Sequence, residues 1–188
     1  GMGSIVPKLL NFAFLLPFYT RTFKDAEYGV ITEIYAYVVI LNVIITFGME
    51  TGFFRFSQDK KLFQSVFTTA TLVVVVLAGL FLALANVFVD SIADLIQYSD
   101  RKEYIVWFSI IIALDCIAAL PFAKLRRVNQ ARKFAIIKLI NVGVNISLVL
   151  FFLKVWPVLY ENNPESWLNQ WYDPNMGVGY VFVANLIT

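Results

Sequence analysis

One carboxylate, Asp115, lies in the middle of an apolar stretch of the chain that reads WFSIIIALDCIAALPFAKLRR. An aspartate side chain is too short to reach water from the centre of an apolar helix of membrane length. A carboxylate in that position must be protonated, paired with a cation, or exposed to a water-filled cavity. We expect Asp115 to face a polar cavity and to be paired rather than catalytic. The alternative is a purely structural ion pair with Lys8 or Lys138.

A polar stripe follows on the next apolar stretch, where Lys138, Asn141 and Asn145 are spaced three and four residues apart. Residues at this spacing share one face of an α-helix. One cation and two amides on a single face suit a helix that lines a cavity. Hydrogen bonding between neighbouring helices is the alternative role of the two amides. Asn42 and Thr46 form a weaker face of the same kind.

Lys8 is a second charge in an apolar stretch, and it directly follows Pro7. Proline leaves a backbone carbonyl without its helical partner and can bend a helix. A cation beside such a break is suited to contact an anionic ligand. Glu33 and Glu50 lie near the two ends of another apolar segment, from which their side chains are expected to reach the interface.

No arrangement of residues typical of an enzyme is present in the sequence. It contains no His and a single cysteine, Cys116. It has no glycine-rich phosphate loop, no metal-ligand spacing and no nucleophile–base–acid set. We therefore expect no catalytic residue, no metal and no cofactor. The net charge of +2 gives no sign of a nucleic-acid partner, and the basic residues gather near predicted helix ends, where membrane lipids are the expected partner.

The chain that carries these polar residues is 60% hydrophobic and only 15% charged, with a mean hydropathy of +0.73. Soluble domains carry about 25% charged residues, and apolar runs of about 18 residues or more predict membrane-spanning helices. We predict an all-α, polytopic transmembrane bundle that forms a single domain over residues 1–188. The predicted segments, five complete helices and the start of a sixth, are about 1–19, 28–54, 64–90, 104–124, 134–158 and 175–188. We expect the chain to be a fragment of a longer protein.

Basic residues in the short connections predict the orientation of the bundle. The connections 55–63 and 124–133 carry eight Lys and Arg residues, whereas those on the opposite side carry four. The richer side is expected to be cytoplasmic, which places the N-terminus in the cytoplasm. The connection 159–174 then faces outward, with Trp167 and Trp171 at the level of the lipid headgroups.

The order of these features resembles a known family. The stretches that carry the resemblance are GSIVPKLLNFAFLLPFYTR, AEYGVITEIYAYVVILNVIITFGMETGFFRF and LPFAKLRRVNQARKFA. Together they resemble the N-terminal portion of the O-antigen-type polysaccharide flippases, within the multidrug/oligosaccharidyl-lipid/polysaccharide exporter superfamily. The resemblance spans nearly all of residues 3–158, through the order and spacing of loose motifs.

This resemblance implies part of the N-terminal lobe of a two-lobe transporter in the bacterial cytoplasmic (inner) membrane. Its cargo would be an oligosaccharide linked to undecaprenyl pyrophosphate, moved from the inner to the outer leaflet, with polysaccharide-assembly proteins as further partners. Lys8 matches a basic residue of the first helix in lipid II flippases, but Phe14 stands where those proteins have a second one. This difference from the lipid II flippases favours a cargo glycan other than that of lipid II.

Such a cargo needs cations for its pyrophosphate and polar groups for its sugars. The cations expected to supply the first are Lys8, Arg55 and Lys138, and the amides expected to supply the second are Asn42, Asn141 and Asn145.

Two other functions remain open at the level of sequence. A cation-coupled multidrug extruder of the same superfamily would use Asp115 as its coupling site. A membrane-embedded glycan polymerase or ligase would need a large outward loop with paired acids or basic residues, and the outward connections here are short.

We predict that Lys8→Ala stalls glycan export, because the pyrophosphate would lose one of its cations. The measurement is the amount of lipid-linked repeat units that accumulates inside the cell. Normal export after removal of both Lys8 and Arg55 would contradict a cationic cavity.

Overall fold

The computed structural model describes residues 13, 15–23, 25–59, 61–162, 165–167 and 169–188. All regular structure in this described part is helical, with no strand. Residues 15–22 are helical. The elements that follow are α2 (Asp25–Thr46), α3 (Met49–Phe56), α4 (Phe63–Val87), α5 (Val89–Leu95), the 3₁₀ turn η1 (Ser99–Arg101), α6 (Lys102–Arg127), α7 (Ala131–Leu150), the π-helical turn η2 (Phe151–Val155), α8 (Trp156–Asn162), the 3₁₀ turn η3 (Asn169–Trp171) and α9 (Gly179–Ile187).

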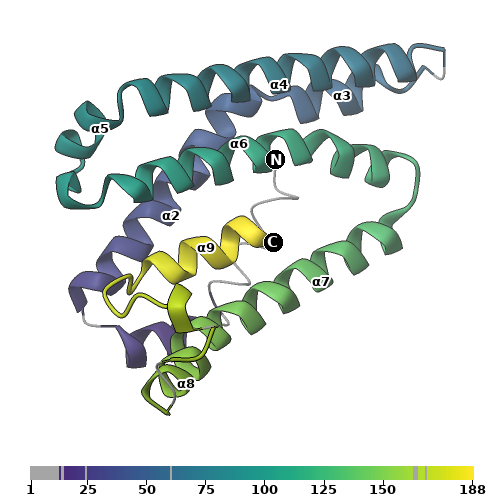
Figure 1. The fold of residues 1–188 in the computed structure, drawn as a ribbon. Helices are drawn as coiled ribbons and strands as arrows, with labels where there is room; N and C mark the ends of the chain where they lie inside the picture. The colour runs from purple at the N-terminus through teal and green to yellow at the C-terminus, as the bar shows by residue number, and fades with distance from the viewer. Residues whose placement is uncertain (1–12, 14, 24, 60, 163–164, 168) are drawn as a thin grey trace.

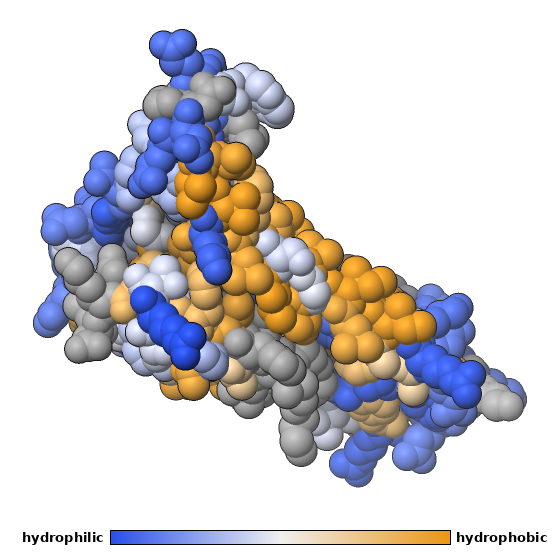
Figure 2. Space-filling view, turned by 90° about the horizontal axis from the view of Figure 1, so that it is seen from below, coloured by the Kyte–Doolittle hydropathy of each residue, from blue (hydrophilic) through white to orange (hydrophobic). Residues whose placement is uncertain are grey.

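Four helical stretches in the described part are long and apolar enough to cross a membrane. They are Tyr28–Thr46, Phe63–Val87, Ser99–Arg127 and Ala131–Asn162. Figure 2 shows the matching surface, with an apolar band between two polar ends. These stretches support a multi-pass membrane protein.

The predicted count of five complete helices and the start of a sixth is not confirmed. Most of the first predicted segment, 1–19, lies outside the described residues. The last one, 175–188, contains α9, which has nine residues and is not among the four stretches long and apolar enough to cross a membrane.

Two predicted segments are divided in the structure. The segment 28–54 breaks at Phe47 and Gly48, whose φ angles of 45° and 67° are left-handed and therefore end α2 before α3 begins. The segment 64–90 ends at Val87, and α5 then folds back toward η1 (Figure 1). Hydropathy does not register either break, because apolar residues continue through both.

The fifth predicted segment is longer than expected and contains a wide turn. Helix α7 continues through η2 and α8 as far as Asn162. Pro157 explains the π-helical turn, since its ring has no N–H and would collide with the carbonyl of Leu153 in a regular helix. The turn directs Phe152 and Trp156 toward α9, where both rings contact Tyr180.

Small side chains hold α4 against α6, the most extensive contact between two elements of the described bundle. Ala70, Val74 and Ala78 on α4 are buried against a complementary row on α6. That row consists of Ile112, Ala113, Cys116, Ala119, Leu120 and Ala123. Because lipid is as apolar as these side chains, close van der Waals contact rather than escape from water stabilises such a pair.

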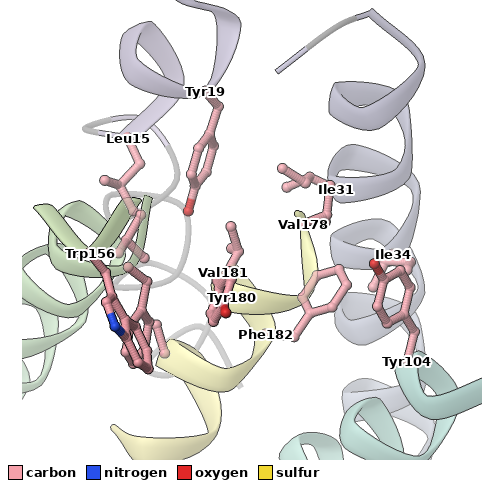
Figure 3. Close-up of a cluster of buried hydrophobic side chains, with 13 residues drawn as sticks. Leu15, Tyr19, Ile31, Ile34, Tyr104, Trp156, Val178, Tyr180, Val181 and Phe182 are labelled. Carbon is pink, nitrogen blue, oxygen red and sulfur yellow. The ribbon is translucent and has the colours of Figure 1, made fainter. Parts of the chain in front are cut away.

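A second cluster secures α9 between the other helices. Figure 3 shows Phe182 and Tyr180 of α9 among Ile31 of α2, Tyr104 of α6 and Trp156 of α8. The rings of Tyr104 and Phe182 meet edge to face at 5.1 Å, a favoured aromatic geometry. In Figure 1, α6 and α7 diverge from their shared turn, and α9 lies between them.

Hydrogen bonds and a ring contact fix several basic side chains at the end of the bundle where α3 meets the turn between α6 and α7. Glu50, which is 8% exposed, accepts a hydrogen bond from Arg126. Arg127 donates to the hydroxyl and carbonyl oxygens of Ser57 at 3.2 Å each. Lys124 places its Nζ 4.1 Å from the centroid of the Phe67 ring. Glu50 therefore pairs with Arg126 inside the fold, although we expected it to reach the interface.

We predict that Glu50→Gln lowers the free energy of unfolding by about 1.5–3 kcal/mol, the value of a hydrogen bond between charged groups that are largely shielded from water. The measurement is denaturant-induced unfolding in detergent micelles. Glu103→Gln is the matched control, because its pair with Arg101 is long at 3.6 Å and half-exposed and is expected to contribute less than about 1 kcal/mol. Equal losses in the two variants would contradict a special role for the Glu50 pair.

Candidate substrate cavity

A cavity of about 540 Å³ lies between α6, α7 and α9. Its walls are mostly aliphatic, in keeping with helices that cross a membrane. The residues that line it are Ile111, Leu114, Asp115, Ala118 and Phe122 of α6, Ile137, Lys138, Ile140, Asn141 and Val144 of α7, and Asn185, Leu186, Ile187 and Thr188 at the end of α9.

The polar groups of this cavity come from all three helices. Asp115 enters from α6, Lys138 and Asn141 from α7, and Asn185 and Thr188 from the end of α9. The structure thus brings together three of the residues singled out from the sequence, which lie on two different predicted segments. One cation, one carboxylate, two amides and one hydroxyl share the same space.

The rotation of α6 explains why Asp115 lines the cavity. Ile111, Ala118 and Phe122 lie four residues before it and three and seven residues after it, so they share its helical face. The adjacent face, which includes Cys116 and Ala119, is buried against α4. Packing of the small residues on α4 therefore turns the carboxylate toward α7.

Lys138 contacts an aromatic ring of the same cavity. Its Nζ lies 4.2 Å from the centroid of Phe122 on α6, within the range of a cation–π interaction. This contact keeps the ammonium group inside the space between the two helices rather than at the helix end. An anionic ligand in the cavity would therefore meet a cation that is already positioned.

The two asparagines of the α7 stripe have different surroundings. Asn141 lines the cavity and donates a hydrogen bond to the carbonyl oxygen of Thr188. Asn145 is 1% exposed and donates to the hydroxyl oxygen of Thr188 at 3.3 Å. Asn145 thus joins α7 to the end of α9, which is the interhelical role that the sequence left open for the amides.

Two other predicted site residues, Asn42 and Arg55, do not line this cavity. Asn42 is buried on α2, where its backbone carbonyl oxygen accepts a hydrogen bond of 2.7 Å from the Thr46 hydroxyl. Arg55 is exposed on α3, with its Cζ 5.7 Å from the centroid of the Phe56 ring. Lys8 lies outside the described residues.

Asn185 and Thr188 were not singled out from the sequence. Asn185 also donates a hydrogen bond of 2.8 Å to the hydroxyl of Tyr35, which connects α9 to α2. The signal that could have found it is a lone amide in the apolar run VFVANLIT, the same signal that marks Asn141. In the described part of the chain, no three His, Cys, Asp or Glu side chains are grouped to hold a metal ion.

A family model described as polysaccharide biosynthesis protein matches residues 19–164. The chain belongs to the polysaccharide biosynthesis protein family. This result confirms the resemblance noted from the sequence, at the level of polysaccharide biosynthesis. The matched residues include α2 to α8, and with them two of the three walls of the cavity. No curated protein and no solved structure matches the chain.

We predict that Asp115→Leu lowers the amount of surface polysaccharide about tenfold, because loss of a polar group from a partly buried polar site costs about 1–3 kcal/mol. Asp115→Asn keeps the polarity and size and is expected to retain more of the polysaccharide. The measurement is surface polysaccharide at matched protein level in the membrane, with Asp100→Asn as the control for an exposed carboxylate outside the cavity. An unchanged amount of polysaccharide with the Leu variant would contradict a functional role of the carboxylate.

Proposed function

We propose that this chain forms part of a membrane transporter that flips an oligosaccharide linked to undecaprenyl pyrophosphate from the inner to the outer leaflet. The observation that carries the proposal is the polar cavity between α6, α7 and α9, inside a bundle of apolar helices. Membership of the polysaccharide biosynthesis protein family supports a glycan as the cargo. Polar groups within membrane-spanning helices typically mark the path of a substrate.

The cavity offers the chemistry that such a cargo requires. Lys138 provides a positive charge for the pyrophosphate. Asn141 and Asn185 provide amides, each able both to donate and to accept hydrogen bonds, for the hydroxyl groups of a sugar. The volume of about 540 Å³ falls within the range of about 300–1,000 Å³ that small-molecule sites occupy. It suits the pyrophosphate and the first sugars, while the prenyl chain stays in the lipid.

The divergence of α6 and α7 supports access to the cavity from one side of the membrane. The two helices meet at the basic turn around Asn129, whose φ of 57° is left-handed, and they separate away from it (Figure 1). In the proposed mechanism, this lobe rocks against a second lobe and exposes the cavity to each leaflet in turn.

A cation-coupled extruder of the same superfamily is the second candidate, and the presence of Asp115 in the cavity wall is the observation that favours it. The charge of the cargo distinguishes the two functions. An anionic carrier needs Lys138, whereas an exported cation needs Asp115. Growth in the presence of cationic dyes therefore reports on the second function, and glycan export reports on the first.

We predict that Lys138→Gln lowers export of the glycan at least about tenfold, because the pyrophosphate loses a charge-assisted contact inside a partly dehydrated site. The measurement is the ratio of lipid-linked repeat units inside the cell to glycan at the surface. Lys133→Gln is the matched control, since Lys133 is exposed near the start of the same helix. Lys138→Arg is expected to keep part of the export.

Full export by Lys138→Gln at normal protein level would overturn the assignment of Lys138 to the cargo. Dye sensitivity that depends on Asp115, with glycan export unchanged, would favour the extruder instead.

A further inference from the structure

A second cavity, of about 270 Å³, lies between α2, α4, α5 and α6. It is close to the α5–η1 turn, at the opposite end of the bundle from the basic α6–α7 turn (Figure 1). Three of its four walls are helices that are long and apolar enough to cross a membrane. Three of the residues that line it, Ile105, Ser109 and Ile112, are buried, so the cavity extends into the bundle.

The inner surface of this cavity is apolar, so it can contact only the hydrocarbon groups of a ligand. Four of its lining residues carry hydroxyl groups, and each hydroxyl is engaged within the protein. Ser109 donates to the Val106 carbonyl at 2.7 Å, and Tyr104 donates to the Met176 carbonyl at 3.3 Å. Tyr37 and Tyr98 both donate to Glu33. Water needs two to four polar partners in a cavity, so this space favours an apolar occupant.

A carboxylate stands at the mouth of the cavity. Glu33 is exposed, and its two oxygens accept hydrogen bonds of 2.9 Å from Tyr37 and 3.0 Å from Tyr98. Burial, together with the hydrogen bond to Glu33, raises the pKa of Tyr98 to about 12. The Tyr98 hydroxyl therefore stays protonated at physiological pH and keeps the carboxylate at the mouth.

The turn beside this mouth adds to its negative charge. Residues 90–103 contain four acids and two bases. Both bases are already paired with acids, Lys102 with Asp90 at 2.7 Å and Arg101 with Glu103 at 3.6 Å. Together with Glu33, the rim has a net charge of −3. It complements a cationic headgroup and repels an anionic one.

We propose that this cavity binds one acyl chain of an aminophospholipid, with the ammonium of the ethanolamine headgroup at the acidic rim beside Glu33. The acyl chain matches the apolar walls, and the headgroup charge matches the rim. A prenyl pyrophosphate would place its anionic group against the same rim, so the occupant differs from the cargo of the proposed function. The site does not depend on that function.

The test measures lipid retained by the purified chain in detergent, by native mass spectrometry after exposure to equal amounts of phosphatidylethanolamine and phosphatidylglycerol with identical acyl chains. We expect one phosphatidylethanolamine to be retained, with a preference of about two- to fivefold over phosphatidylglycerol, the size expected for an exposed ion pair. Absence of a retained lipid, or equal retention of the two lipids, would overturn the proposal.

Variants separate the acyl-chain site from the headgroup contact. Ala85→Phe fills the cavity and is expected to abolish retention, whereas Ala83→Phe makes the same change at an exposed position of α4 outside the cavity. Glu33→Gln is expected to keep the retained lipid and lose the preference for phosphatidylethanolamine, with Glu161→Gln as the control for a distant exposed acid.

Thermal unfolding of each variant checks that it is folded. If Ala85→Phe does not fold, Ile92→Trp on the short helix α5 blocks the same cavity with less disturbance of the α4–α6 contact. Retention by a folded, cavity-filling variant at the level of the unchanged chain would overturn the acyl-chain site. A preserved preference in Glu33→Gln would overturn the headgroup contact.

Discussion

Close packing between α4 and α6 is the contact on which the rest of the structure depends. The small side chains of Ala70, Ala78, Cys116 and Ala119 are buried in it, and they let the two helices approach through van der Waals contact, the interaction available to apolar helices in lipid. This contact also sets the rotation of α6 about its axis. Once one face of α6 is packed against α4, the direction of every other side chain on the helix is determined, including that of Asp115.

Helix α6 consequently separates two cavities of opposite chemistry. Toward one end and on one face, Ile105 and Ile112 line an apolar space beneath an acidic rim. Further along and on another face, Asp115 and Phe122 line a polar space that also receives Lys138. In the two proposals, a ligand with an anionic headgroup binds in the second cavity beside Lys138 and is disfavoured at the acidic rim of the first. The proposals therefore assign a bound lipid and a transported cargo to separate sites.

The polar groups within the bundle are mostly engaged with one another, which the low dielectric of a membrane demands. Glu50 pairs with Arg126 at the basic end, and Glu33 accepts from two tyrosines at the other end. Asn145 and Asn185 join α9 to α7 and α2. These contacts hold α9 between helices that otherwise diverge, and they thereby form the third wall of the polar cavity.

The sequence by itself determined the all-α class, the approximate limits of the apolar helices and the polar face that contains Asn141, because span length and helical periodicity are local properties. Tertiary structure alone decided which polar faces meet. It placed Asp115 with Lys138, turned Asn145 toward α9, left Arg55 exposed and added Asn185. The physical reason is that periodicity describes a helix relative to its own axis, whereas a site depends on how neighbouring helices pack and rotate against one another, and on left-handed backbone breaks that hydropathy does not register.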